Sequence, residues 1–227
     1  MKEAENRTIK DLLYDQVARI ARALASPKRL EIVEVLCQGE KTVESLAQST
    51  DLDIRMASAH LKELKAARLV ESRKQGRYVH YRLADEAVAS LWVSLRSVAE
   101  ELLAELQKVV RDFVSEPHAL APLDRRTMLA KARDGQVIVI DVRPESEYAA
   151  AHLPFARSVP LDELKRRLAE LPRGTEIVAY CRGPFCMFAN DAVAFLRAQG
   201  YQARRIEDGV AEWRASGMPL DRGGAAA

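Results

Sequence analysis

Two cysteines in the second half of the chain, Cys181 and Cys186, enclose a short loop with the composition of a reactive thiol site. The residues between them are Arg-Gly-Pro-Phe, an apolar run ends at Tyr180, and a helical pattern follows Met187. In such a loop, successive backbone N–H groups and the N-terminus of the following helix can surround the sulfur of Cys181. We therefore predict that the pKa of Cys181 is lowered and that a thiolate or persulfide anion is stabilised there, with Arg182 adding positive charge.

The other two cysteines allow more than one interpretation. Cys186 is either a small apolar residue in the first turn of the helix or a resolving thiol that converts a persulfide on Cys181 into a disulfide. Cys37 ends an apolar helical stretch, which favours a buried thiol over a redox partner. Three cysteines in a reducing compartment form no disulfide framework, so any function of a thiol would depend on its reactivity.

A basic segment lies in the first half of the chain. Residues 53–83 hold eight Lys and Arg against three acids, whereas residues 84–112 hold three against six. Asp53 can cap a helix that continues to about Arg68, and residues 69–83 form a strand–turn–strand pattern. Such a helix can place polar side chains in the major groove of DNA, and the strands can reach adjacent phosphates. The candidates are Arg55, Ser58, His60, Lys62 and Lys65 for the groove, and Arg73, Lys74 and Arg77 for the phosphates.

Further helices complete this half. One apolar stripe at helical spacing consists of Leu12, Leu13, Val17, Ile20 and Leu24. Ser26 and Pro27 begin a second helix that ends at Gly39, and Thr42 can cap a short third one. A long helix is predicted from Asp85 to about Phe113. Its apolar residues, three and four positions apart, suit a seam between two helices. They are Leu91, Leu95, Val98, Leu102, Leu106 and Val109.

The second half has a different pattern. Val137–Ile140 and Ile177–Tyr180 are short apolar runs separated by helical stretches such as Leu161–Leu171. Runs of this kind predict buried strands of a parallel sheet. Residues 116–123 contain two prolines, Pro117 and Pro122, and we interpret this segment as a linker. The expected organisation is a mainly α winged helix-turn-helix domain at residues 1–115 and an α/β domain with a parallel sheet and flanking helices at residues 124–227.

Residues 8–112 resemble the ArsR family of winged-helix repressors. The resemblance is carried by the run that begins Ala25-Ser-Pro-Lys-Arg, by Ala57-Ser-Ala-His-Leu-Lys-Glu-Leu, and by Gly76-Arg-Tyr-Val-His-Tyr-Arg-Leu. It implies a homodimer in which the first and last helices pair, and an effector that releases the protein from operator DNA. Considered alone, a basic helix and hairpin are as often only a solvated surface. Residues 41–45 hold no cysteine and residues 84–112 hold no histidine, which argues against the metal sites common in this family.

The second half resembles single-domain rhodaneses over residues 124–220. Besides the cysteine loop, the motifs are Ile140-Asp-Val-Arg-Pro, Glu147-Tyr, His152-Leu-Pro and Glu207-Asp-Gly-Val-Ala-Glu-Trp. The resemblance implies a sulfurtransferase scaffold without a cofactor, in which Cys181 takes a sulfur atom as a persulfide. The candidate catalytic residues are Cys181, Arg182, Gly183, Phe185, Cys186, Met187, Asp141 and Arg143. Among them, we expect Asp141 and Arg143 to organise the loop, and we expect Trp213 to serve in packing.

Composition sets the outer limits on function. The chain has 48% hydrophobic and 30% charged residues, no apolar run long enough to span a bilayer, and no signal-peptide core at its start, so we expect a cytoplasmic globular protein. The expected partners are double-stranded operator DNA, a second copy of the chain, and a small sulfur donor such as thiosulfate, polysulfide or persulfide.

Three functions fit the sequence. The first is a repressor coupled to a rhodanese domain that detects or handles sulfane sulfur. The second is a sulfurtransferase whose DNA-binding half serves mainly in dimerisation, and the third is a metalloid-responsive repressor. The basic groove residues favour the first function over the second, and the missing ligand motifs weigh against the third.

Overall fold

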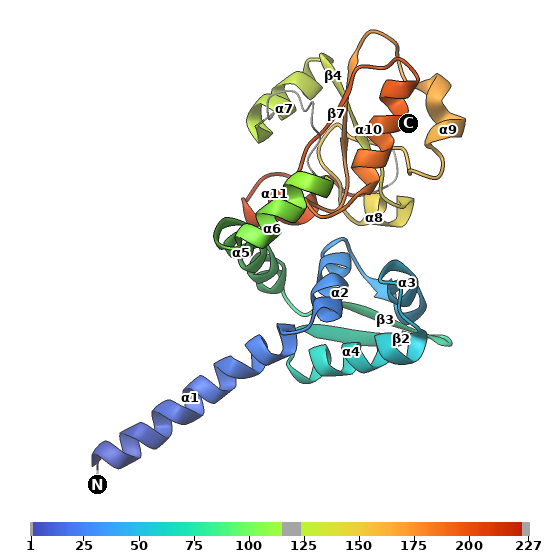
Figure 1. The fold of residues 1–227 in the computed structure, drawn as a ribbon. Coiled ribbons are helices and arrows are strands. Elements are labelled where there is room, and N and C mark those ends of the chain that lie inside the picture. Colours follow the sequence, from blue (N-terminus) through green and yellow to red (C-terminus); the bar gives the residue numbers. More distant parts are fainter. Residues whose placement is uncertain (1, 115–123, 224–227) are drawn as a thin grey trace. The chain divides into compact units, whose positions relative to one another are not determined.

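The computed structural model describes residues 2–114 and 124–223, in two compact units, Met1–Trp92 and Val93–Ala227 (Figure 1). The predicted linker, residues 116–123, lies outside the described residues. Within them, no helix is both long and apolar enough to cross a membrane.

The first unit contains α1 (Lys2–Leu24), α2 (Pro27–Cys37), α3 (Val43–Ser49) and α4 (Ile54–Ala66). Helices α2, α3 and α4 begin where the sequence analysis places their caps. The N–H of Ser45 donates to Oγ1 of Thr42 at 3.2 Å, and the N–H of Met56 donates to Oδ1 of Asp53 at 2.8 Å. These bonds satisfy amides that the first helical turn leaves without a partner. One apolar face of α4 is fully buried, so its other face remains available to a partner. The buried side chains are Ala57, Leu61 and Leu64.

A small antiparallel sheet follows α4. Strands β2 (Val70–Gln75) and β3 (Tyr78–Leu83) pair from Val70 opposite Leu83 to Gln75 opposite Tyr78, as the sequence predicts for a wing. Gly76 has a φ of +59°, a conformation that glycine adopts without strain, and it turns the chain between the strands. A third strand, β1 (Lys41–Thr42), pairs with β3. The sequence analysis missed β1 because two residues are too few to show an alternating pattern.

Helix α5 (Glu86–Leu102) has two apolar faces. Val88, Ala89 and Trp92 are buried. A second stripe is exposed, with Leu91 and Leu95 at 40%, Val98 at 52% and Leu102 at 72%. In Figure 1 most of helix α1 stands apart from the other elements of the first unit. The apolar side chains that α1 exposes are Ile9, Leu12, Leu13, Tyr14 and Val17. Exposed apolar rows of this length are typical of surfaces that another chain covers.

The prediction of one helix from Asp85 to Phe113 is wrong. Helix α5 ends at Leu102, and the chain continues as α6 (Ala104–Val109) and a π-helical turn, η1 (Val110–Val114). Leu103 has an extended backbone, and the side-chain amide of Gln107 donates to the carbonyl oxygens of Glu100 and Glu101 at 3.0 and 2.9 Å. These bonds replace the backbone bonds that a continuous helix would supply, so the helix can end without unsatisfied carbonyls.

The second unit contains a four-stranded parallel sheet in the order β5-β4-β6-β7. Its strands are β4 (Val137–Asp141), β5 (Arg157–Ser158), β6 (Glu176–Tyr180) and β7 (Ala203–Arg205). Its helices are α7 (Arg125–Arg133), α8 (Glu145–Ala150), α9 (Leu164–Arg167), the 3₁₀ turn η2 (Leu168–Glu170), α10 (Phe188–Ala198) and α11 (Val210–Ala215). The two predicted strands are confirmed, whereas the short edge strands β5 and β7 were not expected. The predicted helical stretch Leu161–Leu171 is shortened to α9 and η2.

Both faces of this sheet are buried, which explains why its central strands are apolar throughout. Alternate residues of β6 point to opposite faces. Val178 and Tyr180 join one core cluster with residues of α7, α8 and α11, and Ile177 and Ala179 join another with residues of α9 and α10. Because the carboxyl ends of parallel strands meet at one edge, the segments after β4, β5 and β6 are gathered there, and the cysteine loop is among them.

Candidate functional site

The cysteine loop directly follows the central strand. Strand β6 ends at Tyr180, and the loop runs from Cys181 to Met187 before α10. Cys181 is 3% exposed, and its Sγ donates to the carbonyl oxygen of Cys186 at 3.3 Å. The N–H of Cys186 donates to the carbonyl oxygen of Gly183 at 3.1 Å, which closes the turn. Gly183 has a φ of +155°, where a side chain would be strained.

The two thiols of the loop differ in acidity. Burial raises the pKa of Cys181 well above its ordinary value, and the hydrogen bond to Cys186 raises it further, although the N–H groups of Ala189 and Gly183 act in the opposite direction. A hydrogen bond between the two thiol side chains lowers the pKa of Cys186 to about 7, and the N–H groups of Arg182 and Phe188 and the positive charge of Arg182 lower it further. The prediction of a lowered pKa for Cys181 is therefore wrong. Desolvation opposes charge on the Cys181 sulfur, and the two thiols titrate as a pair in which Cys186 is the more acidic.

Arg182 is held in place by a buried acid. Its Nε and Nη2 donate to the two carboxylate oxygens of Glu147 at 3.1 and 2.8 Å, and Glu147, on α8, is 1% exposed. The guanidinium also lies over the ring of Phe188, 5.5 Å from its centroid. A two-bond arginine–carboxylate pair fixes the orientation of both groups. It fixes the start of the loop and places positive charge beside Cys186.

Asp141 and Arg143 form a fully buried ion pair at the end of β4. Arg143 also donates to the carbonyl oxygen of Ala151 at 2.8 Å, and the hydroxyl of Tyr180 donates to Oδ2 of Asp141 at 2.5 Å. Burial raises the pKa of Tyr180, so this hydroxyl keeps its proton. The network ties β4 to the residue just before Cys181. These contacts organise the ends of the strands, and none of them involves the sulfur.

The start of α11 packs closely against the loop. A Cβ atom added to Gly209 would lie 2.5 Å from the carbonyl oxygen of Arg182 and 2.6 Å from that of Cys181, so only glycine fits. The N–H of Gly209 donates to Oε2 of Glu212 at 2.7 Å. Trp213 is completely buried, as expected of a packing residue. Gly209 and the start of α11 therefore pack directly against the backbone of the loop at Cys181 and Arg182.

The basic candidates of the first unit lie on α4 and the wing. Arg55, Lys62 and Lys65 on α4 are exposed, as are Lys74 and Arg77 on the wing, whereas Ser58 and His60 are partly buried. These exposed side chains give α4 and the hairpin the positive charge that a nucleic-acid backbone requires.

Arg73 has a partner within the unit. Its Nε donates to Oε2 of Glu40 at 2.8 Å, Nη2 also contacts Glu40, and Nη1 donates to Gln75 at 2.8 Å. Arg73 lowers the pKa of Glu40, chiefly through the hydrogen bond. A phosphate contact by Arg73 must compete with this carboxylate. Arg77 instead lies over the ring of Tyr78, and its Nη2 donates to the Tyr78 hydroxyl at 2.6 Å, a neutral partner that does not compensate its charge.

Comparison with known proteins decides the family. Residues 26–72 match the family described as bacterial regulatory protein, arsR family, and residues 125–216 match the rhodanese-like domain. The HTH-type transcriptional regulator Rv0324 of Mycobacterium tuberculosis is 43% identical over 214 residues, 94% of this chain and 94% of the relative. The chain belongs to the ArsR family of transcriptional regulators. Its second half is a rhodanese-like domain, so both resemblances of the sequence are confirmed.

Two further relatives match one half of this ArsR-family regulator each. A sulfurtransferase of Allochromatium vinosum is 27% identical over 100 residues, 43% of this chain and 92% of its own. A solved structure from Mycobacterium bovis is described as the homodimeric winged helix-turn-helix DNA-binding domain of a possible ArsR-family regulator. It is 45% identical, covers 42% of this chain and 89% of its own, and has a TM-score of 0.40.

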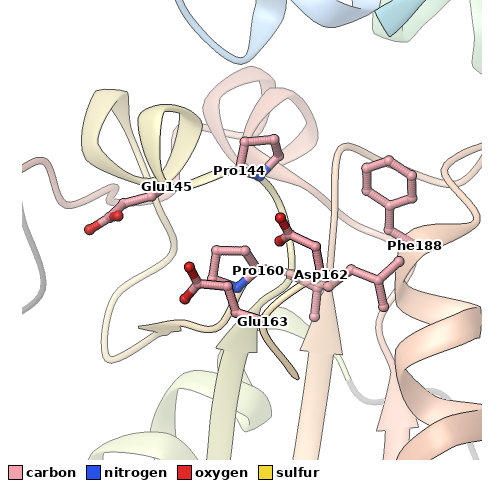
Figure 2. Close-up of a pocket in the computed structure, with 8 residues that line it drawn as sticks. Pro144, Glu145, Pro160, Asp162, Glu163 and Phe188 are labelled. Atoms are coloured by element: carbon pink, nitrogen blue, oxygen red, sulfur yellow. The ribbon is translucent and has the colours of Figure 1, made fainter. Parts of the chain in front are cut away.

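A pocket of about 370 Å³ opens at the carboxyl edge of the rhodanese-like sheet. Figure 2 shows Pro144 and Glu145 on one side, Asp162 and Glu163 below, and Phe188 opposite. The negative charge of Glu163 is paired with Arg166, whose Nη2 lies 3.1 Å from Oε1 of Glu163. Phe188 is also the residue whose ring lies under Arg182, so the pocket adjoins the cysteine loop. Its carboxylates make this approach to the loop less favourable for anions.

The sequence analysis missed several residues of these sites. Glu147 and Glu212 occur within the quoted rhodanese motifs, but no pattern shows that they pair with arginines. Ile54 and Met56 expose 54% and 49% of their surface on α4, where apolar tips can contact thymine methyl groups. The sequence signal that could have identified Ile54 and Met56 is that both are apolar and lie outside the buried stripe of α4. Cys37 is 1% exposed, which agrees with the expectation of a buried thiol.

Proposed function

We propose that this protein is an operator-binding repressor whose rhodanese-like domain forms a persulfide on Cys181 and thereby weakens DNA binding. The observation that carries this proposal is the pairing of two thiols in one loop, with Cys186 poised as a thiolate near neutral pH. A buried thiol that keeps its proton is a poor nucleophile unless a base lies beside it. Cys186 is such a base.

The proposed chemistry has two steps. The Cys186 thiolate takes the proton of Cys181, and the Cys181 thiolate attacks the sulfane sulfur of the donor. With thiosulfate, the new bond joins Sγ of Cys181 to the outer sulfur, the S–S bond of thiosulfate breaks, and sulfite leaves with the electron pair. With a small persulfide or polysulfide, a thiolate or shortened polysulfide leaves instead. The N–H groups of Gly183 and Ala189 then stabilise the terminal persulfide anion.

Cys186 also gives the persulfide a second fate. Cys186 can pass the proton that it took from Cys181 to the outer sulfur and attack Sγ of Cys181, which forms the Cys181–Cys186 disulfide, breaks the persulfide S–S bond and releases hydrosulfide. Transfer to an external thiol is the other outcome. Mass spectrometry separates them, because a persulfide adds one sulfur atom to the protein whereas the disulfide removes two hydrogens.

DNA binding is proposed for the face formed by α4 and the wing of a homodimer. Exposed Arg55, Lys62 and Lys65 support groove contacts, and Lys74 and Arg77 support phosphate contacts. The exposed apolar stripes of α1 and α5 support pairing with a second copy, because a single chain leaves them in water. The first and last helices are also the ones that pair in this family.

An operator shift assay with and without polysulfide tests the proposal, with wild type compared to Cys181→Ser and Cys37→Ser. We expect polysulfide to weaken operator binding in wild type and Cys37→Ser but not in Cys181→Ser. A response that persists in Cys181→Ser and vanishes in Cys37→Ser would place the sensor in the winged-helix half. A protein that takes sulfur but binds no operator would support the alternative of a sulfurtransferase with a dimerisation module.

A further inference from the structure

Helix α5 contacts the cysteine loop through one arginine. The C-terminal part of α5, from Val93, belongs to the second unit. Arg96 in this part is only 4% exposed, and its Nη1 donates to Oε1 of Glu212 at 2.8 Å. Its Nε lies 3.4 Å from Oε1 of Glu100, one helical turn further along. A guanidinium buried between two carboxylates has a fixed position.

This buried pair lies against the backbone of the loop. A Cβ atom added to Gly183 would lie 3.3 Å from Nη1 of Arg96 and 3.3 Å from Oε1 of Glu212. The guanidinium is 5.7 Å from the centroid of the Phe185 ring. Glu212 in turn accepts the hydrogen bond from Gly209, the residue that supports the loop. The space between Gly183 and the Arg96–Glu212 pair is too small for a methyl group without a small shift, so a movement of the loop toward the pair displaces it.

Arg96 belongs to neither of the two matched modules. The ArsR match ends at residue 72, and the rhodanese match begins at residue 125. One helical turn before Arg96, Trp92 is buried, as are Ala89 and Val88, and Trp92 is the last residue of the first unit. The residues of α5 up to Trp92 thus belong to the first unit, and those from Val93, Arg96 among them, belong to the second.

We propose that Arg96 is a positioning residue of the Cys181–Cys186 loop and that it couples the state of this loop to the position of α5. The inference rests on the proposed function, in which the loop changes charge and size. A persulfide adds a sulfur atom about 2 Å from Sγ and places a negative charge in a buried loop. This charge competes with Glu212 for Arg96, so sulfur loading shifts the placement of the guanidinium and of the helix that carries it.

Coupling of this kind is reciprocal. If loading of the loop weakens operator binding through Arg96, operator binding must disfavour loading of the loop by the same factor. The alkylation rates of the two thiols report a change in the loop without any sulfur donor. The coupling can therefore be tested on protein that has not been treated with a sulfur donor.

The experiment uses full-length dimers of four proteins. They are wild type, Arg96→Lys, the double variant Arg96→Met/Glu212→Gln, and the control Arg204→Ala. The double variant removes the charges of Arg96 and Glu212 together, and Glu100, which also loses its partner, is 31% exposed and so keeps access to water. The control breaks another largely buried pair, in which Nε of Arg204 lies 2.5 Å from Oε1 of Glu176. The two side chains are 16% and 17% exposed, and Glu176 lies at the opposite end of β6 from Cys181. Thermal melting confirms folding of each.

The first measurement is the rate of alkylation of Cys181 and Cys186 against pH, with and without operator DNA. In wild type and the control, we expect operator DNA to change the rates about fivefold or more. We expect no change in the double variant and an intermediate change in Arg96→Lys. A DNA effect that survives in the double variant, or is missing in wild type, overturns the proposal. So does an equal loss in Arg204→Ala, since that would indicate a general structural effect.

The second measurement is operator affinity before and after polysulfide treatment. The double variant should take up sulfur at Cys181, detected by mass, and should bind the operator equally well in both states. A retained difference between the two states overturns the coupling role of Arg96. Wild type that gains no sulfur would instead contradict the proposed function, while the alkylation measurement still decides whether Arg96 links α5 to the loop.

Discussion

Sγ of Cys181 donates to the carbonyl oxygen of Cys186 at 3.3 Å, so the two thiols share one tight turn. This turn places the more acidic sulfur at the second cysteine rather than at the one that ends the strand. The dependence of thiol chemistry on pH is therefore a property of the pair.

Alkylation of Cys186 should follow a pKa of about 7 in wild type, with the rate rising as pH increases through this value because only the thiolate reacts. The hydrogen bond between the two thiols is the largest cause of this low pKa. In Cys181→Ala the pKa of Cys186 should rise, and each of the first pKa units should lower its alkylation rate at pH 7 at least about fivefold, since a rise of one unit from about 7 reduces the thiolate fraction from about a half to about a tenth. Peptide mass mapping measures the rates, and Cys37→Ser should retain the wild-type profile.

Wing residues should differ in their contribution to DNA binding. Arg77→Ala should weaken binding to all sequences and reduce the salt slope by about one unit, because one phosphate contact is lost. Arg73→Ala should have a smaller effect, because Glu40 already compensates Arg73. Titrations at several salt concentrations measure both. Arg111→Ala, on the exposed turn after α6, serves as the control, and equal effects of Arg73 and Arg77 would contradict the role assigned to Glu40.

Glu40→Gln should have the opposite effect on affinity. Without the carboxylate, Arg73 becomes available to a phosphate, so binding to all sequences should strengthen and the salt slope should increase by up to about one unit. The double variant Glu40→Gln/Arg73→Ala should return affinity to the level of Arg73→Ala alone. A Glu40→Gln protein with unchanged or weaker binding would show that Arg73 does not reach the DNA.

Breaking the buried pair at the end of β4 should destabilise the rhodanese-like domain. Asp141→Asn leaves Arg143 buried beside a neutral group, and removal of one partner of a buried pair costs about 3–5 kcal/mol. Arg166→Ala, which removes an exposed partner of Glu163, should cost less than about 1 kcal/mol. Urea unfolding followed by tryptophan fluorescence measures both, because Trp213 lies in the same domain. Comparable losses would contradict the structural role of Asp141.

Charge on the exposed stripe of α5 should separate the dimer. We expect Leu95→Glu and Leu102→Glu, at 40% and 72% exposed positions, to shift the protein to monomers, since each would place a carboxylate in an apolar seam. Sedimentation measures the mass, and operator affinity should fall in parallel. Ser94→Glu, an exposed polar position on the same helix, should leave the dimer intact. Monomeric wild type would remove the basis for this prediction.

Most of the architecture followed from the sequence because it depends on local signals. Thr42 and Asp53 cap helices by bonds to amides three residues ahead, and apolar runs such as Val137–Ile140 identify strands buried on both faces. The same locality explains the errors. Gln107 ends α5 through carbonyls six and seven residues back, and strands of two or three residues carry too few positions to show a period.

The sequence by itself therefore determined the two modules, the loop with its two cysteines, and the basic helix and wing. Only the tertiary structure decided how these groups behave. Burial raised the pKa of Cys181, a hydrogen bond between the two thiols lowered the pKa of Cys186, and Glu40 compensated Arg73 across 33 positions of the chain. Arg96 met Glu212 across 116 positions. Desolvation and ion pairing depend on which groups share a buried space, and residues distant in sequence share it only after the chain has folded.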